Sequence, residues 1–307
     1  MAEPLAYVPN EGSGPISIVD ATRDEVLGEL EGAERPRGIA VSPDGARLYV
    51  SDQPNKALAV FDLQRKKLER TIDLGESPEG VSLSPDGRLI AAASDMANAV
   101  LLIDADKAAV VATIRTEGQN PEHAVFSPDG RWLYASAEDA SQVDVIDVAA
   151  RRQVAVVQVG KRPRGIAFTP DGKRAYVACE LAGTVYAIEV PSHKVVASIR
   201  AGKFSNGVTM HPRGDRVYVS NGRDRSVSVV DVASNKVIAT VEVGMRPWNM
   251  AITPEGDRLY VANGRSNSVS VIDTQSNRRV KDIPVGERPW GVAMGPATGN
   301  AARGGSR

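Results

Sequence analysis

The residues of this sequence that could do chemistry recur at a fixed step and are not gathered in one motif. One position, next to a recurring proline, varies among the copies and carries Arg37, Glu79, Glu122, Arg164, Asn206, Trp248 and Trp290. His123 follows Glu122 where most copies have glycine, and Arg246 and Arg288 precede the proline in two late copies. Guanidinium groups bind carboxylates and phosphates, and indole rings offer a flat stacking surface. This set predicts a site for a small anionic ligand or for a partner protein.

Motifs for established catalytic chemistries are missing. The sequence has no Gly-x-Ser-x-Gly elbow, no P-loop and no metalloprotease helix motif. Glu122 and His123, even with Cys179 or Glu180, give too few and too scattered ligands for a metal site. Glu79 and Glu122 could act as acid and base, with their position as the sole argument. We therefore predict no catalytic residue and no metal site, and the sequence identifies no cofactor.

Three markers repeat along the chain with one common step. The turn Ser42-Pro43-Asp44-Gly45 returns at Ser84, Ser127, Thr169, His211 and Thr253, with a degenerate seventh copy at Gly295-Pro296, in steps of 42 or 43 residues. The proline marker is Pro36, Pro78, Pro121, Pro163, Pro247 and Pro289, with Ser205 in the fifth copy. An acidic residue closes each apolar run at Asp20, Asp62, Asp104, Asp147, Glu189, Asp231 and Asp273. The agreement predicts seven structural repeats.

Each repeat has the pattern of four short strands. Apolar and small polar residues alternate in segments such as 268–273, and Pro, Asp, Asn and Gly separate the segments. No sustained helical period occurs, so we expect no helix. The chain begins with a second, a third and a fourth strand, and ends just after a first strand at 291–294. The sequence thus predicts an all-β, seven-bladed β-propeller with four-stranded antiparallel blades, closed when the C-terminal first strand joins the three N-terminal strands.

In such a ring the variable positions meet on one face around the axis. We call this the top face, and the residues at the variable position of each copy the axial residues. The second and third blades present acids there, including Glu79, Asp95, Glu122 and Glu138, and the remaining blades present arginines and the two tryptophans. A basic and aromatic arc is therefore expected to face an acidic arc. His193 and His211 fall on the opposite face.

Composition excludes several classes of protein. The formal net charge is −1, which lacks the basic surplus of a nucleic-acid binder. No apolar run approaches 18 residues and no polybasic cluster occurs, so membrane insertion is not expected. The single cysteine excludes an internal disulfide, and the N-terminal residues show no signal-peptide pattern. We predict one propeller domain over residues 1–296, a disordered tail over 297–307 and a monomer.

The repeat unit resembles the YVTN-family β-propeller repeat. The resemblance rests on residues 258–263 (RLYVAN), 268–273 (SVSVID) and 285–291 (VGERPWG), and extends over most of the chain. Residues 35–38 (RPRG) and the late Arg-Pro-Trp segments are similar to the subgroup associated with PQQ-dependent catabolism. The resemblance implies a periplasmic or secreted protein working near quinoprotein dehydrogenases. It carries over no catalytic residues.

These observations lead to one functional hypothesis and two alternatives. The leading hypothesis is a non-catalytic periplasmic binding or scaffolding propeller that engages a partner protein or a small anionic ligand on its top face. One alternative is a lactonase-like or lyase-like enzyme that uses the top-face carboxylates, since related propellers include lactone hydrolases. The other is a carrier of a quinone or tetrapyrrole cofactor, which the basic and aromatic arc of the top face suggests.

Overall fold

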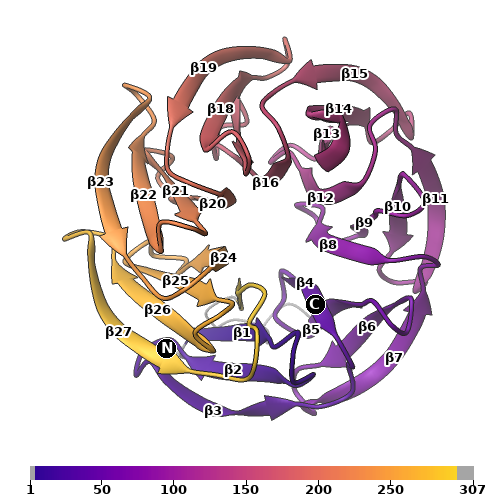
Figure 1. The fold of residues 1–307 in the computed structure, drawn as a ribbon. Helices are drawn as coiled ribbons and strands as arrows, with labels where there is room; N and C mark the ends of the chain where they lie inside the picture. The colour runs from indigo at the N-terminus through magenta and orange to yellow at the C-terminus, as the bar shows by residue number, and fades with distance from the viewer. Residues whose placement is uncertain (1–3, 296–307) are drawn as a thin grey trace, which may run out of the picture.

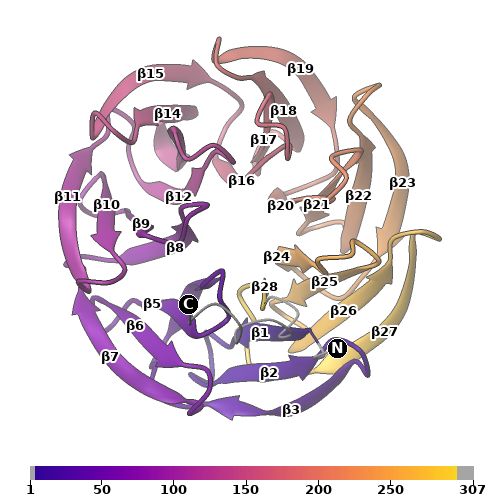
Figure 2. The ribbon, with the colours of Figure 1, turned by 180° about the vertical axis from the view of Figure 1, so that it is seen from behind.

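The structure is a computed structural model that describes residues 4–295, and these form a ring of seven four-stranded antiparallel sheets (Figure 1, Figure 2). The predicted seven-bladed all-β propeller is confirmed. The first strand of each blade lies next to the axis and the fourth lies on the outer rim (Figure 1). We number the blades by the chain order of their innermost strands, so that the closing blade is blade 7.

The strands of the first four blades have the following bounds. Blade 1 is β4 (Pro36–Val41), β5 (Arg47–Asp52), β6 (Ala57–Asp62) and β7 (Lys67–Asp73). Blade 2 is β8 (Pro78–Leu83), β9 (Leu89–Ser94), β10 (Ala99–Asp104) and β11 (Ala109–Arg115). Blade 3 is β12 (Pro121–Phe126), β13 (Trp132–Ala137), β14 (Gln142–Asp147) and β15 (Arg152–Gln158). Blade 4 is β16 (Pro163–Phe168), β17 (Arg174–Cys179), β18 (Thr184–Glu189) and β19 (Lys194–Arg200).

The remaining blades follow the same order. Blade 5 is β20 (Ser205–Met210), β21 (Arg216–Asn221), β22 (Ser226–Asp231) and β23 (Lys236–Glu242). Blade 6 is β24 (Pro247–Ile252), β25 (Arg258–Asn263), β26 (Ser268–Asp273) and β27 (Arg278–Pro284). Blade 7 is β28 (Ala293–Met294), β1 (Leu5–Pro9), β2 (Ile16–Asp20) and β3 (Glu25–Leu30).

The repeated turn residues hold the hairpins in the way their types predict. In blade 1, Ser42 Oγ donates to Asp44 Oδ1 at 2.5 Å and accepts the backbone N–H of Arg47 at 2.9 Å. Gly45 has φ of +70°, a conformation that favours glycine. The aspartates that close the apolar runs accept backbone N–H groups of the next turn, as Asp62 does from Arg65, and Glu189 accepts the hydroxyl of Ser192 at 2.6 Å. These acids are therefore structural turn residues.

The hydrophobic core is divided among the contacts between neighbouring blades. Seven clusters of buried residues occur, one for each pair of adjacent blades. The cluster between blades 7 and 1, for example, packs Tyr7 and Ile16 against Leu48 and Phe61. Each blade buries its apolar side chains against its two neighbours. A single blade outside the ring would expose these side chains to water.

The two ends of the chain close the ring in blade 7, as predicted. β28 pairs antiparallel with β1 through Ala6↔Met294 and Tyr7↔Ala293, and the two segments lie together in Figure 2. The backbone N–H of Trp290 donates to Pro9 O at 2.9 Å. The regular part of the closing strand is shorter than the predicted 291–294, because only Ala293 and Met294 pair in register.

One expectation about secondary structure needs a small correction. A single 3₁₀ turn, Glu138–Ala140, follows β13 on the top face, where we expected no helix of any kind. Its residues bring Glu138, which is buried, toward the axis. Among residues 4–295 no helix is long and apolar enough to cross a membrane. The tail predicted to be disordered, 297–307, lies outside the described residues.

Candidate functional site

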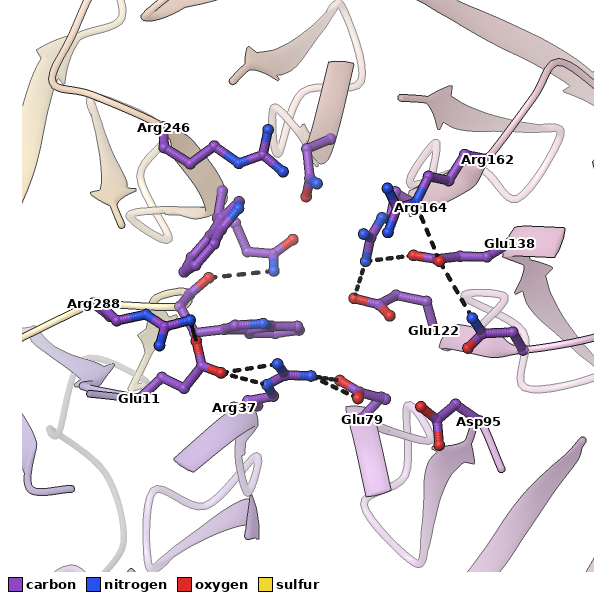
Figure 3. Close-up of a pocket in the computed structure, with 15 residues that line it drawn as sticks. Glu11, Arg37, Glu79, Asp95, Glu122, Glu138, Arg162, Arg164, Arg246 and Arg288 are labelled. Atoms are coloured by element: carbon purple, nitrogen blue, oxygen red, sulfur yellow. Dashed lines mark hydrogen bonds and ion pairs between the residues drawn. The ribbon is translucent and has the colours of Figure 1, made fainter. Parts of the chain in front are cut away.

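A cavity of about 270 Å³ lies at the axis of the top face (Figure 3). Nine of the ten predicted site residues line it: Arg37, Glu79, Glu122, Arg164, Asn206, Trp248, Trp290, Arg246 and Arg288. The tenth, His123, does not. The other lining residues are Glu11, Asp95, Asn120, Glu138, Arg162 and Asn249. The repeat alignment thus brought together residues that are far apart in the chain.

A bulge in the innermost strand aims the axial residues at the cavity. In β4, Pro36 pairs with Asp52 and Ile39 with Val50, so Arg37 and Gly38 stand opposite Ser51 alone. Strands β8, β12, β16, β20 and β24 show the same shift. An extra residue in one strand of a pair turns a side chain out of the regular alternation. The bulge also explains why the variable position lies just after the proline marker.

Serine side chains link the bulges of neighbouring blades. Ser51 Oγ accepts the backbone N–H of Gly38 at 2.8 Å and donates to the backbone oxygen of Glu79 at 2.6 Å. A Cβ on Gly38 would stand 2.3 Å from that same oxygen. Glycine is therefore required where one first strand approaches the next, and backbone groups left free by the bulge find partners.

One group of ion pairs centres on Glu11. This carboxylate is buried and accepts hydrogen bonds from Arg35 Nη2 at 2.8 Å and from Arg37 Nε at 3.0 Å and Nη2 at 2.8 Å. Arg288 Nη2 lies 3.3 Å from its second oxygen. Arg37 Nη1 also contacts both oxygens of Glu79 at 2.6 Å (Figure 3). Arg37 thus joins blade 7 to blade 2.

A second group centres on Arg164. Its Nη1 lies 2.5 Å from Glu122 Oε1 and 2.6 Å from Glu138 Oε1 (Figure 3). Its Nε lies 3.2 Å from Glu180 Oε2. Arg246, from the loop before blade 6, reaches Glu180 in blade 4, with Nη2 2.7 Å from Oε1. The expected acidic and basic arcs are therefore joined by ion pairs and do not face each other unpaired.

Glu11 is the important residue that the sequence reading missed. It follows the second strand of its blade, and a step of 42 or 43 residues places it in register with Gln53, Asp95, Glu138 and Glu180. Glu138 and Glu180 were recognised at this position, but Glu11 lies in the incomplete N-terminal repeat, which has no turn marker before it. Aligning the partial repeat by its second strand would have found it.

The two buried glutamates of blades 2 and 3 differ in their proton affinity. Burial, together with the negative charge of Glu122, raises the pKa of Glu79 to about 8 against the opposing effect of Arg37. Burial alone would also raise the pKa of Glu122, but Arg164, with His123 and Arg37, outweighs it and the pKa is lowered. The pKa of Glu79 is therefore raised and that of Glu122 lowered, so the two carboxyl groups release their protons over different pH ranges.

Two glycines make room for cavity side chains of blade 6. A Cβ on Gly264 would lie 2.6 Å from the ring of Trp248, and a Cβ on Gly222 would lie 3.0 Å from Nη1 of Arg246. These glycines occupy the repeat position that holds Glu11, Glu138 and Glu180 in other blades. The absence of a side chain at these positions lets the indole of Trp248 lie over Gly264 and the guanidinium of Arg246 lie over Gly222.

His123 lies beside the cavity lining, against Trp290. The ring centroids are 5.4 Å apart, and Trp290 is only 8% exposed. Burial lowers the pKa of His123 to about 4, so the imidazole is neutral at pH 7. Its Nε2 is buried and has no hydrogen-bond partner among the described residues. His193 and His211 lie in turns of the opposite face, as expected.

The metal and cysteine predictions concern the same region. Within residues 4–295, no group of three or more His, Cys, Asp or Glu side chains is placed to hold a metal ion. Cys179 is buried at the end of β17, and burial raises the pKa of its thiol to about 12. A buried thiol of this kind is unreactive.

Comparison with known protein families gives two partial matches. Residues 149–283 match the model of the seven-bladed lactonase propeller family, and residues 2–124 match that of the cytochrome D1 haem domain. No curated protein matches the sequence. The family matches and the similar structures below are all consistent with the propeller fold.

Similar solved structures cover nearly the whole ring. Hydrazine synthase from Kuenenia stuttgartiensis is 28% identical with a TM-score of 0.80, covering 87% of this chain and 92% of that one. A functionally unknown protein from Desulfotomaculum acetoxidans DSM 771 is 17% identical with a TM-score of 0.83, covering 95% and 99%. A putative 6-phosphogluconolactonase from Bacteroides fragilis NCTC 9343 is 22% identical with a TM-score of 0.81, covering 95% and 98%.

Proposed function

We propose that this protein is a non-catalytic binding propeller whose top-face cavity engages a small anionic ligand or the anionic side chains of a partner protein. The observation that carries the proposal is the unused capacity of three arginines. Among the described residues, Arg162, Arg246 and Arg288 each use one side-chain nitrogen in their ion pairs. A guanidinium has five N–H donors, so each retains donors for an anion.

The carboxylates of the cavity are engaged differently. Glu11, Glu79, Glu122 and Glu138 are each bonded to at least one arginine. Each of these carboxylates is fixed in position by its arginine, and Arg164 lowers the pKa of Glu122, so the Glu122 carboxylate is poorly suited to take a proton from a substrate. The cavity therefore favours binding over chemistry. Trp248 and Trp290 add flat apolar walls for the non-polar part of a ligand.

The cellular setting of the proposal rests on the repeat itself. The similarity to the YVTN repeat and to the subgroup associated with PQQ-dependent catabolism supports a periplasmic or secreted protein that serves quinoprotein-dependent oxidation. We propose a monomer, because the closed ring leaves no innermost strand unpaired. Nucleic acid is not proposed as a partner, given the net charge of −1.

The binding proposal is tested first by native mass spectrometry of the protein purified from its own periplasm. A discrete excess mass identifies a bound ligand. In parallel, citrate, phthalate and pyrophosphate are titrated by calorimetry into the wild type and into Arg246→Gln and Trp248→Ala. We expect at least one anion to bind, and Arg246→Gln to weaken it about tenfold, because a charge-assisted hydrogen bond is lost.

The matched control is Arg265→Gln, which removes an exposed arginine that does not line the cavity. It should leave binding unchanged. A mass without excess, together with no anion binding, would contradict the ligand form of the proposal. Equal affinity of wild type and Arg246→Gln would place any binding elsewhere on the molecule.

A second candidate, a lactonase-like enzyme, is favoured by two observations. The lactonase family model matches residues 149–283, and Glu79 has a pKa raised to about 8, which suits a general acid. Hydrolysis of a panel of lactones, with and without a chelator, tests it. If the protein is a lactonase, Glu79→Gln lowers the rate at least tenfold, whereas Glu69→Gln on the outer strand β7 does not. No hydrolysis of any lactone removes this candidate.

The match to a haem domain does not extend to the cavity. Haem iron is held by His, Cys, Met or Tyr side chains, and the lining residues are Glu, Asp, Asn, Arg and Trp. These residues do not fit an iron-bound haem, so we derive no step through one. A quinone carrier needs no such ligand. Its test is a visible or near-ultraviolet absorption band that persists after purification.

A further inference from the structure

A second hollow on the top face lies beside the axial cavity, between blades 4 and 5. Its volume is about 340 Å³, and we call it the rim groove. Residues of the β17–β18 loop and of the segment from the end of β19 to β20 form it, with Arg223 and Asp224 from the β21–β22 loop. None of its lining residues lines the axial cavity. The groove is therefore a separate surface.

The groove combines an apolar patch with small residues. Leu181 is 55% exposed, and Phe204 forms a half-buried wall. Two guanidinium groups lie over the Phe204 ring, with Arg223 at 4.2 Å and Arg246 at 5.4 Å from its centroid. Exposed apolar side chains beside an aromatic ring provide an anchor site for a partner's apolar side chain.

The border of the groove is positively charged. Arg200, Lys203 and Arg223 are exposed, and none of them forms an ion pair with another described residue. Asp224 is the one exposed acid in the lining, and its Oδ2 accepts the backbone N–H of Lys203 at 2.7 Å. Because the whole chain has a net charge of −1, this local surplus of cations is a feature of the groove.

The groove adjoins the axial cavity through one residue, Arg246. Arg246 lines the axial cavity, stacks on Phe204 and pairs with Glu180, which itself lines the groove. A partner seated in the groove would therefore press on a residue that we assign to ligand binding. This places the partner next to the functional face.

We propose that the rim groove docks an acidic segment of a partner protein, with an apolar side chain of the segment against Leu181 and Phe204. The carboxylates of the segment pair with Arg200, Lys203 and Arg223. Charge complementarity selects this partner, since three unpaired cations surround an apolar anchor. The inference goes beyond the proposed function, because it assigns a different surface and the chemistry of the protein that binds there.

The test uses the full chain and a fluorescein-labelled octapeptide with a central Leu-Phe pair between two runs of three glutamates. Binding is followed by fluorescence anisotropy at low and at physiological salt. We expect saturable binding that weakens as salt rises. Arg223→Glu and Lys203→Glu should each weaken binding about tenfold through reversal of a charge in the groove. Leu181→Ser should weaken it as well, and this exposed residue is not needed for folding.

The matched control is Arg265→Glu. Arg265 occupies the same repeat position in blade 6, and its backbone N–H bonds Met245 O at 3.1 Å, just as that of Arg223 bonds Lys203 O at 3.2 Å. We expect Arg265→Glu to change binding less than twofold. A peptide with lysines in place of the glutamates should not bind.

Three outcomes overturn the proposal. The first is no saturable binding of the acidic peptide to the wild type. The second is an equal loss for Arg265→Glu and Arg223→Glu, which would show attraction to the face as a whole. The third is tighter binding of a labelled ten-residue thymidine oligonucleotide than of the peptide. Trp248→Ala in the axial cavity should leave peptide binding intact, so failure here and failure of the ligand proposal are distinguishable.

Discussion

Arg164 shows how single side chains set the character of the cavity. Its guanidinium lies within 3.2 Å of the carboxylates of Glu122, Glu138 and Glu180, and only 12% of its side chain is exposed. Removal of one partner from such a buried group leaves a charge without compensation. The free-energy cost of that buried charge exceeds the stabilisation that the intact ion pair provides. Each member of the network is thus needed for the others, whatever the ligand is.

Glu79 gives a pH dependence of stability that can be measured. Its pKa is 4.5 when unperturbed and about 8 in the folded protein. Between these values the folded state keeps a proton that the unfolded state releases, so the contribution of Glu79 to stability is largest below pH 4.5 and is lost as pH rises through 8. Between pH 6.5 and 8 we expect a loss of about 2 kcal/mol in the free energy of unfolding. Urea unfolding at several pH values measures it.

The choice of pH range separates Glu79 from His123. Because the pKa of His123 is lowered to about 4, its effect falls between pH 4 and 6.5, where stability is lost as pH falls. Glu79→Gln keeps the neutral form of the side chain and should flatten the profile above pH 6.5. Glu69→Gln, on the outer rim, should keep the wild-type slope. A wild-type profile that is flat from pH 6.5 to 8 would show that Arg37 holds Glu79 ionised.

At the scale of the elements, the strand bulge and the loop after the second strand decide what enters the cavity. In blades 1 to 6 the bulge turns one residue to the axis. The loop position carries a carboxylate in blades 2, 3, 4 and 7, Gln53 in blade 1, and glycine in blades 5 and 6. Gly222 and Gly264 therefore act as space for Arg246 and Trp248 of blade 6. A glutamate at this position pairs with an arginine, whereas glycine leaves space for a side chain of the cavity.

Substitution of Gly264 and Gly222 by alanine compares the effect of a rigid neighbour, the Trp248 ring, with that of a flexible one, the Arg246 side chain. In Gly264→Ala the new Cβ meets the indole of Trp248 at 2.6 Å, and the ring must move as a whole. We expect a loss of about 1–3 kcal/mol in the free energy of unfolding, with a shift in tryptophan fluorescence. In Gly222→Ala the neighbour is the end of Arg246 at 3.0 Å, which can turn aside at a cost within about 1 kcal/mol.

These two variants serve as controls for each other, because both are in the same repeat position. Urea unfolding and fluorescence spectra of both proteins are the measurements. Equal losses of stability would contradict the assignment of Trp248 to the space above Gly264. An unchanged fluorescence spectrum in Gly264→Ala would contradict it as well.

At the scale of the whole molecule, the sequence was sufficient for the ring and insufficient for the ion pairs. Seven copies of the turn, the proline and the closing acid repeat whatever the function, because packing and turn geometry require them in every blade. They predicted the blades, the closure and nine of the fifteen residues that line the cavity. Pairing depends on how far a side chain reaches across blades. Arg246, for example, reaches Glu180 two blades away, which spacing alone does not specify.

Closure is the property of the whole ring, and its loss should unfold the protein. A chain ending at residue 287 lacks β28 and the backbone bonds of Trp290 to Pro9 and of Arg288 to Glu11. It also lacks the buried side chains of Trp290 and Val292. Together these contribute on the order of 5–10 kcal/mol, which equals the stability of a typical domain.

We expect the chain of residues 1–287 to aggregate or to lose cooperative thermal unfolding, because the edge of β1 is left unpaired. Size-exclusion chromatography and circular dichroism melting measure this. A chain ending at residue 297 keeps the closing contacts that the described residues 288–295 make and should melt like the full-length protein. Addition of a synthetic peptide of residues 288–297 to the shortened chain should restore the melting transition, since the peptide supplies the missing first strand. If residues 1–287 alone melt at the full-length temperature, then the contacts between blades hold the ring and the closing strand does not.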